Sequence, residues 1–183
     1  MGLGIVIVIG GLHGTGKSTC AKKLANKLHL RYVSAGELFR SMAKDRRMSI
    51  EEFSRYAEHH REVDKEVDSK VIEASRKGNA VIEGQIAANL IEKPDITVFL
   101  TANEGVRVQR LSYRDKKNHD EVLRETKMRE ESERNRYMDA YGINVHDISS
   151  YNLIIDTSKW SAEAVTEIII KAVKEYMKEK LKT

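Results

Sequence analysis

Features that are scarce in this sequence exclude whole classes of protein. A single cysteine, Cys20, cannot form a disulfide framework within the chain, so we expect a reducing, cytoplasmic setting. The apolar run at residues 5–9 is too short to span a membrane and lacks the basic flank of a signal peptide, and no later run is long enough either. We therefore expect no membrane partner.

The charged residues also lack a strong bias. Lys and Arg number 32 against 28 Asp and Glu, which gives a net charge of +4 that is spread along the chain. Nucleic-acid-binding proteins typically carry a clustered basic stripe or a basic patch interleaved with aromatic side chains, and neither pattern occurs. Hydrophobic residues make up 40% and charged residues 33%, which is typical of a globular chain, and 183 residues suit one domain.

Short apolar segments alternate with segments of helical periodicity. The predicted strands are residues 5–9, 32–33, 80–83, 96–100 and 153–155. The predicted helices follow Gly16, span 34–46, begin at Ser49, span 62–77 and 104–140 with a break near 117–118, and follow Ser161. This alternation predicts an α/β fold with a parallel sheet covered on both faces and ligands beyond the carboxyl ends of its strands. The last helix is expected to bury one stripe: Val165, Ile168, Ile169, Ala172, Val173 and Tyr176.

A glycine-rich loop joins the first predicted strand to the first predicted helix. Its residues, Gly11, Leu12, His13, Gly14, Thr15, Gly16, Lys17 and Ser18, match the phosphate-binding pattern G-x-x-x-x-G-K-[ST]. Glycines let backbone N–H groups point inward around an anion, and the start of the helix adds its positive dipole end. In this pattern the lysine reaches the β- and γ-phosphates of a nucleoside triphosphate, and the serine hydroxyl binds Mg²⁺.

Three nearby positions allow two interpretations each. Thr19 is either a second hydroxyl near the triphosphate or an ordinary helix residue, and His13 is either a loop residue without a chemical role or a catalytic histidine. We favour the plainer interpretation for both. Glu83 ends a predicted strand before Gly84, and we favour a carboxylate that orders water on Mg²⁺ over one that merely serves the turn.

Arginines are concentrated in the second half of the chain, where seven of fourteen lie between residues 107 and 136. Arg129, Ser132 and Arg136 share one face of a predicted helix. Two guanidinium groups on one face suit a phosphoryl group in transfer, although pairing with the helix's own glutamates at i, i+4 explains the spacing equally well. Arg110 and Arg114 either clamp phosphate, stack on a base or face solvent.

Taken together, these motifs resemble the nucleoside monophosphate kinase family, most of all its archaeal cytidylate kinases. The similarity spans nearly the whole chain. Beyond the phosphate loop it is carried by residues 33–40, 42–53, 62–68, 81–84, 129–137, 141–143 and 151–157. The resemblance implies a P-loop three-layer sandwich with a five-stranded parallel sheet. Within the single domain, residues 34–77 would be a helical monophosphate-binding segment and residues from about 114 to 136 a helical lid.

The resemblance also implies a reaction, the Mg²⁺-assisted in-line transfer of a phosphoryl group from ATP to CMP or dCMP. Lys17, Arg129 and Arg136 would be catalytic. The acceptor site would contain Ser34, Gly36, Arg40, Gln85 and Glu133, with Glu133 at the nucleoside sugar. Arg110 and Arg114 would lie near the donor adenine, as would the backbone near Lys159 and Trp160. The expected partners are small-molecule nucleotides bound to a monomer.

Three positions depart from the family pattern. Gln85 stands where the family usually has an arginine on the acceptor phosphate, and Ser69 and Val71 stand where Arg and Gln are common. An amide does not replace a guanidinium fork, so these departures bear on the identity of the acceptor. Two alternatives remain at this stage: a kinase for AMP or UMP, and a nucleotide-binding module without an acceptor site. A nucleic-acid ATPase is disfavoured by the absence of a basic patch.

Overall fold

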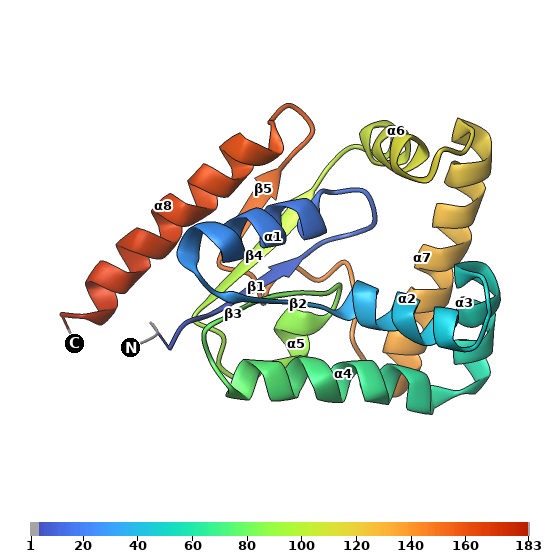
Figure 1. Cartoon of the computed structure of the whole chain (residues 1–183), viewed down its shortest axis with the longest axis horizontal. Coiled ribbons are helices and arrows are strands. Elements are labelled where there is room, and N and C mark those ends of the chain that lie inside the picture. The colour runs from blue at the N-terminus through green and yellow to red at the C-terminus, as the bar shows by residue number, and fades with distance from the viewer. Residues whose placement is uncertain (1–3, 183) are drawn as a thin grey trace.

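A computed structural model describes residues 4–182, and its centre is one parallel sheet (Figure 1). The strands are β1 (Val6–Gly10), β2 (Arg31–Ser34), β3 (Ala80–Glu83), β4 (Ile96–Thr101) and β5 (Leu153–Asp156). Their order in the sheet is β2-β3-β1-β4-β5, and every neighbouring pair is parallel. In register, Val8 of β1 lies between Ile82 of β3 and Thr97 of β4. The five predicted strands and the parallel α/β class are confirmed.

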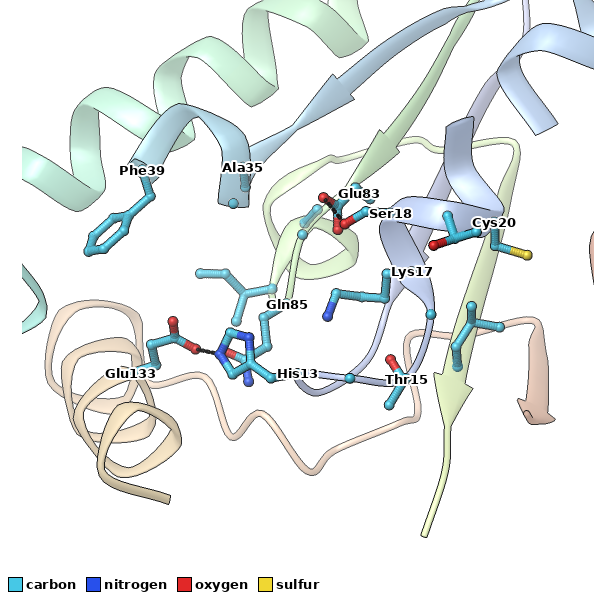
Figure 2. A pocket seen from close by; sticks show the side chains of 18 of the residues that line it. His13, Thr15, Lys17, Ser18, Cys20, Ala35, Phe39, Glu83, Gln85 and Glu133 are labelled. Atoms are coloured by element: carbon cyan, nitrogen blue, oxygen red, sulfur yellow. Dashed lines mark hydrogen bonds and ion pairs between the residues drawn. The ribbon is translucent and has the colours of Figure 1, made fainter. Parts of the chain in front are cut away.

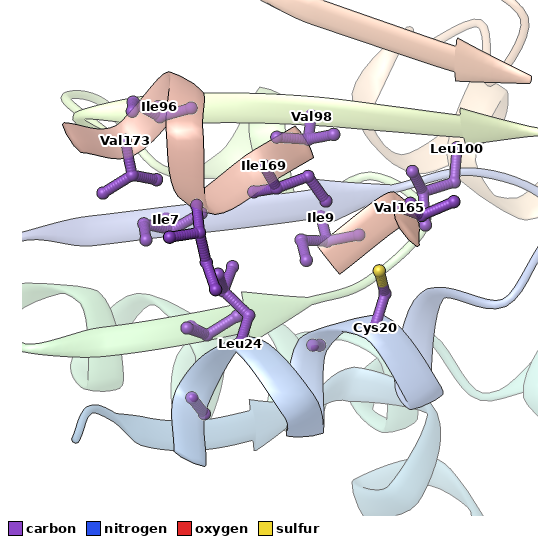
Figure 3. Packing of buried hydrophobic residues seen from close by; sticks show 14 of the residues in the cluster. Ile7, Ile9, Cys20, Leu24, Ile96, Val98, Leu100, Val165, Ile169 and Val173 are labelled. Atoms are coloured by element: carbon purple, nitrogen blue, oxygen red, sulfur yellow. The ribbon is translucent and has the colours of Figure 1, made fainter. Parts of the chain in front are cut away.

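Helices cover both faces of the sheet because alternate side chains of β1 are apolar in both directions. On one face, α1 (Lys17–Leu28) and α8 (Ala162–Lys180) pack over Ile7 and Ile9 (Figure 3). On the other face, α4 (Arg61–Arg76) and the short α5 (Ala87–Leu90) pack over Val6 and Val8. These two layers hold the carboxyl ends of the strands in fixed positions.

A smaller helical unit projects from the α4 side of the sheet. It contains α2 (Ala35–Asp45), α3 (Ile50–His59) and the first turns of α4, which share a core around Phe53. Beside it lie α6 (Glu104–Asp115) and the long α7 (His119–Tyr141). Figure 1 shows α7 running from beside α6 down to α4. The sheet and this helical unit therefore face each other across the strand ends.

Side-chain caps set several helix boundaries where the sequence predicted them. Ser49 and Glu52 form a reciprocal capping box at the start of α3. Asn118 caps α7 two residues after the left-handed residue Lys116, which explains the predicted break in residues 104–140. Ser161 caps α8.

Two details differ from the sequence prediction. Ile168 was expected in the buried stripe of the last helix, but it is 38% exposed. The stripe runs instead through Val165, Thr166, Ile169, Ile170 and Val173, and Ile168 lies on the other side of the helix axis. The one-turn helix α5 was not predicted, because four residues are too few to show a period.

Candidate active site

A cavity of about 390 Å³ opens between the strand ends and the helical unit (Figure 2). The loop from His13 to Ser18 forms one wall, and side chains of α2, α4, α6 and α7 form the others. The cavity therefore lies at the edge of the sheet where the sequence placed the ligand. No helix within residues 4–182 is long and apolar enough to cross a membrane.

The glycines of the phosphate loop are required by its backbone. Gly11 has φ +134°, and a Cβ there would lie 2.1 Å from the carbonyl oxygen of Leu100. Gly14 has φ +78°, and its Cβ would lie 2.6 Å from the carbonyl oxygen of Arg107. Both distances are too short for a Cβ atom, so only glycine at these two positions permits this loop conformation. Gly11 and Leu12 shape the loop from behind, since neither lines the cavity.

Lys17 lies at the start of α1 and faces the cavity (Figure 2). Its ammonium donates a hydrogen bond to the Leu12 carbonyl at 2.8 Å, and the Thr15 hydroxyl donates to the same oxygen at 2.8 Å. Burial lowers the pKa of Lys17, and the carboxylate of Glu83 opposes that shift. Together with the N-terminus of α1, this cation makes the loop wall a binding surface for a polyanion. Thr19 also lines the cavity but is exposed.

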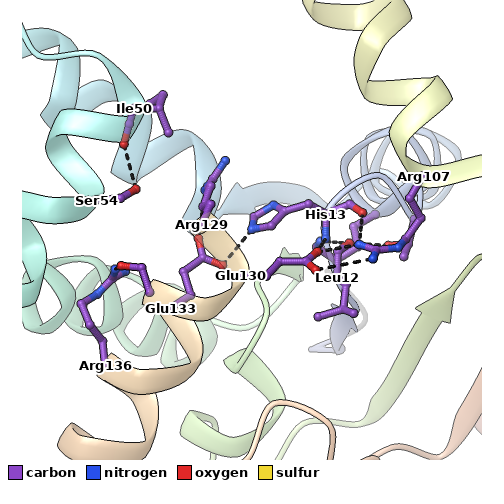
Figure 4. Close-up of polar contacts among 12 residues, drawn as sticks. Leu12, His13, Ile50, Ser54, Arg107, Arg129, Glu130, Glu133 and Arg136 are labelled. Atoms are coloured by element: carbon purple, nitrogen blue, oxygen red, sulfur yellow. Dashed lines mark hydrogen bonds and ion pairs between the residues drawn. The ribbon is translucent and has the colours of Figure 1, made fainter. Parts of the chain in front are cut away.

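Side chains outside the motif hold the loop in place (Figure 4). The Arg107 guanidinium donates to the His13 carbonyl at 2.9 Å and to Glu130 at 2.5 Å, while the His13 amide donates to Glu130 at 3.3 Å. The His13 ring lies 2.8 Å from a carboxylate oxygen of Glu133. Sequence reasoning assigned nothing to Arg107 and Glu130, whose separation of 23 residues gives no local signal. The loop is thus tied to both α6 and α7.

Glu133 joins the loop to a predicted catalytic arginine. It is 5% exposed, and its second oxygen accepts a hydrogen bond from Arg129 at 3.1 Å. Burial alone raises the pKa of Glu133, but His13 and Arg129 hold that pKa well below its usual range. Burial lowers the pKa of His13. Both carboxylate oxygens of Glu133 therefore have partners within the protein, although the resemblance assigned this residue to the nucleoside sugar.

Oxygen atoms gather where β3 ends beside α1. The Ser18 hydroxyl donates to Glu83 at 3.0 Å, and the hydroxyls of Ser34 and Tyr32 donate to the same carboxylate oxygen. A hydroxyl and a carboxylate fit Mg²⁺, which prefers oxygen ligands and keeps most of its water. No cluster of three or more His, Cys, Asp or Glu residues suited to a metal occurs among the residues described. Ser34 also caps α2 and does not line the cavity.

A group of cationic side chains from α2 and α7 also lines the cavity. Burial lowers the pKa of the Arg40 guanidinium, and the positive charge of Arg129 lowers it further. Gly36 leaves room for that guanidinium, because a Cβ at this position would lie 3.3 Å from an Arg40 nitrogen. Arg40 and Arg129 repel each other, and an anion bound between them would relieve this repulsion. Gln85 lines the same cavity, and both polar atoms of its side-chain amide are buried without a hydrogen-bond partner among residues 4–182.

Arg136 is more enclosed than the sequence suggested. It is 7% exposed, its Nε donates to Asp64 at 2.8 Å, and a terminal nitrogen donates to Ser132 at 2.9 Å. Arg129 does pair with a glutamate of its own helix at i, i+4, as the alternative interpretation proposed. Both arginines nevertheless line the cavity. Arg129 and Arg136 of α7 therefore form ion pairs within the protein and also line the cavity.

Two further arginines, Arg110 and Arg114, line the cavity from α6. Arg110 donates to the Thr157 hydroxyl at 2.9 Å and to the Thr157 carbonyl at 2.7 Å. Arg114 forms a two-point ion pair with Asp115, at 2.6 and 2.7 Å. Trp160 also lines the cavity and is 54% exposed. Arg110 also donates to the Gly14 carbonyl at 3.4 Å, so it lies beside the phosphate loop. The role of Arg110 and Arg114 at the donor base stays a prediction.

Two acids of α4 were missed by the sequence analysis. Asp64 and Asp68 line the cavity and are 7% and 9% exposed. They lie four residues apart on the face that also carries Val63, Val67 and Val71. A pair of acids within an apolar stripe is a signal that could have identified them. Ser69, in contrast, is exposed and donates to the Lys65 carbonyl.

Comparison with known proteins gives one consistent result. Residues 6–159 match the sequence model of the cytidylate kinase-like family. A cytidylate kinase of Methanocaldococcus jannaschii is 44% identical over 173 residues, covering 92% of this chain and 97% of the relative. A cytidylate kinase of Pyrococcus horikoshii is 44% identical over 169 residues, covering 92% of this chain and 88% of the relative.

Solved structures agree on the fold at low sequence identity. An uncharacterized protein from Eubacterium ventriosum matches with a TM-score of 0.71 at 21% identity, covering 93% of this chain and 98% of the other. A shikimate kinase from Bacteroides thetaiotaomicron matches with a TM-score of 0.60 at 17% identity, with the same coverage. At such identities the likeness supports the expected P-loop kinase architecture alone.

Proposed function

The chain belongs to the cytidylate kinase-like family, and on this premise we propose that it transfers the γ-phosphoryl group of ATP to CMP or dCMP. One observation carries the proposal: the phosphate loop with Lys17 and the arginines Arg40 and Arg129 line a single cavity. A polyanion on the loop and a second anion between the arginines would place two phosphates opposite each other.

The donor binds on the loop side. Backbone N–H groups of residues 13–18 and the start of α1 hold the β- and γ-phosphates, and Lys17 leaves the Leu12 carbonyl to reach them. The adenine lies toward Arg110, Arg114 and Trp160, whose planar groups suit stacking. The Ser18 hydroxyl and, through water, Glu83 would hold Mg²⁺, which would supply positive charge to neutralise the phosphates.

The acceptor phosphate binds near Arg40, with Gly36 and Gln85 beside it. One of its anionic oxygens attacks the γ-phosphorus in line, and the bond from that phosphorus to the leaving ADP oxygen breaks. The nucleophile is already anionic, so no general base is required. Arg129 and Arg136 neutralise the charge that develops between donor and acceptor, and correct positioning accounts for the rest of catalysis.

Closure of the helical segments would complete the site. We assign residues 34–77 to a monophosphate-binding segment and residues from about 114 to 136 to a lid, both within one domain. The contacts of Arg107 and Glu133 with the phosphate loop support this assignment, because they connect α6 and α7 to the donor site. Closure excludes water, which would otherwise hydrolyse ATP.

A coupled ADP-release assay over CMP, dCMP, UMP, AMP and GMP tests the proposal. We expect CMP and dCMP to give the highest kcat/KM. Turnover of AMP at the same efficiency would overturn the cytidylate assignment. Calorimetry distinguishes the remaining alternative, since tight binding of ATP without binding of any monophosphate would indicate a nucleotide-binding module instead.

A further inference from the structure

Asp68 is a buried carboxylate that faces the cavity with one oxygen unused. Its side chain lies on α4 and is 9% exposed. The Tyr141 hydroxyl donates a hydrogen bond to Oδ2 at 2.5 Å. Within residues 4–182, Oδ1 receives no hydrogen bond and the carboxylate has no ion pair. A carboxylate so enclosed is costly unless something completes its hydrogen bonding.

The neighbouring carboxylate of Asp64, unlike that of Asp68, has a partner for both of its oxygens. Asp64, one turn earlier on α4, is paired through both oxygens with Arg136, at 2.8 and 3.5 Å. That arginine is therefore committed to Asp64 and does not neutralise Asp68. Burial raises the pKa of Asp68 to about 6, and the negative charge of Asp64 adds to this shift. The cavity wall also contains the apolar side chains of Phe39, Val71 and Leu90.

The position of Asp68 matches the base end of an acceptor. Along α7, Arg129 is linked through Glu133 to the phosphate loop, Arg136 contacts Asp64, and Tyr141 contacts Asp68. These contacts run in order from the loop toward α4, as the course of α7 shows (Figure 1). A monophosphate whose phosphate lies at Arg40 and Arg129 would thus extend its base toward the wall that contains Asp68.

Pyrimidines differ at the position that such a carboxylate would contact. Cytosine carries an amino group on C4, which donates hydrogen bonds, whereas uracil carries an oxygen there, which accepts them. An ionised carboxylate only accepts. We propose that Oδ1 of Asp68 accepts a hydrogen bond from the C4 amino group of the acceptor base and thereby selects cytosine over uracil. This inference rests on the proposed kinase function and assigns the specificity of its acceptor site.

Tyr141 has a positioning role in this arrangement. Its hydroxyl holds Oδ2, so the carboxylate can turn only one oxygen toward the ligand. Uracil at the same place would bring its oxygen against that of Asp68 and would leave a buried charge without a donor. A site built around one hydrogen bond rejects a ligand that lacks it far more strongly than an apolar pocket rejects a missing methylene group.

The test compares two substrates on two enzymes. Steady-state kinetics at saturating ATP give the ratio of kcat/KM for CMP to kcat/KM for UMP in wild type and in Asp68→Asn. The asparagine amide can donate to uracil and accept from cytosine, so we expect the ratio to fall by about 100-fold, mostly through KM. Glu66→Gln is the matched control, because Glu66 is an exposed acid on the same helix that pairs with Lys70, and it should leave the ratio unchanged.

A substrate analogue gives an answer without any substitution. The 5′-monophosphate of the 2-pyrimidinone ribonucleoside has hydrogen in place of the C4 amino group. Wild type should use it at least about 10-fold less efficiently than CMP, and Asp68→Asn should discriminate less between the two. Tyr141→Phe removes only the hydroxyl and should lower the CMP-to-UMP ratio by a smaller factor, with CMP turnover retained.

The outcomes separate this inference from the proposed function. If wild type prefers CMP, and both the analogue and Asp68→Asn leave discrimination unchanged, the assignment of Asp68 is wrong and the kinase function stands. If wild type phosphorylates no cytidine nucleotide, the proposed function itself fails. If Asp68→Asn does not fold, as circular dichroism would reveal, the analogue on wild type still decides.

Discussion

The two sides of the cavity are built in different ways. The donor side is a continuous loop whose shape follows from glycines and whose charge comes from backbone N–H groups and Lys17. The acceptor side is assembled from side chains of α2, α4 and α7, such as Arg40, Asp64 and Arg136, which are far apart in the sequence. The first side is anchored to the sheet, and the second depends on helix packing. We therefore expect substitutions on the two sides to fail in different ways.

The largest effect is expected for Lys17→Ala on the donor side. Loss of the ammonium removes the charge that reaches the β- and γ-phosphates, so transfer should fall by more than about 10³-fold. Single-turnover and steady-state assays would measure the loss. Lys23→Ala is the matched control, because Lys23 lies on the same helix but forms an exposed ion pair with Glu163. Residual activity near that of the control would contradict the donor assignment.

Arg129→Ala tests whether Arg129 acts on the phosphoryl group as it passes from donor to acceptor. We expect kcat to fall by about 100-fold while the Kd for ATP changes by less than about 3-fold, because this charge acts mainly on the group in transfer. Isothermal calorimetry and the coupled assay separate the two quantities. Arg124→Ala, at an exposed position of the same helix, should be nearly silent. Intact turnover in Arg129→Ala would show that the lid assignment is wrong.

Asp64→Asn should act through stability. The substitution leaves the buried Arg136 guanidinium without its ion pair, so the free energy of unfolding should fall by about 3–5 kcal/mol. Denaturant titration measures it. Adding Arg136→Met should recover much of this loss, since the unpaired charge is then gone. A single variant as stable as wild type would mean that helix packing on the acceptor side does not depend on this pair.

Asp68→Asn should stabilise the protein at high pH. The pKa of about 6 lies above the ordinary aspartate value of 3.8, so the folded state binds more protons than the unfolded state between these values. The free energy of unfolding of wild type therefore falls as pH rises through about 6, by up to about 3 kcal/mol. The variant should melt at a higher temperature at pH 8 and lose that advantage at pH 4. Asp64, Tyr137 and Tyr141 also interact with this group and should be kept unchanged.

The sequence predicted the donor side well because its information is local. The motif from Gly11 to Ser18, the strand before it and the helix after it lie within 25 residues, and each glycine has a backbone reason to be present. The five strands and most helix boundaries followed from apolar periodicity and from caps such as Ser49. The short α5 and the exposed Ile168 were missed, because periodicity is weak over one turn and does not fix the centre of a stripe.

The acceptor side was predicted only in part. Arg40, Arg129 and Arg136 were named, but nothing in the spacing of the arginines indicated that one would pair with Asp64, 72 residues away. Asp68 and Tyr141 likewise meet only through packing of α4 against α7, at a separation of 73 residues. Ion pairs and hydrogen bonds between residues so far apart in the chain depend on tertiary packing, for which the sequence shows no local pattern.

Glu133 connects the donor side of the cavity to the proposed lid. One of its carboxylate oxygens serves His13 in the phosphate loop and the other serves Arg129 in the proposed lid. A substitution at Glu133 would remove the partner of both His13 and Arg129. The residues of the two sides that contact Glu133 are therefore not free to change independently during evolution. Among relatives of this chain, residues 13, 129 and 133 are therefore expected to change together or not at all.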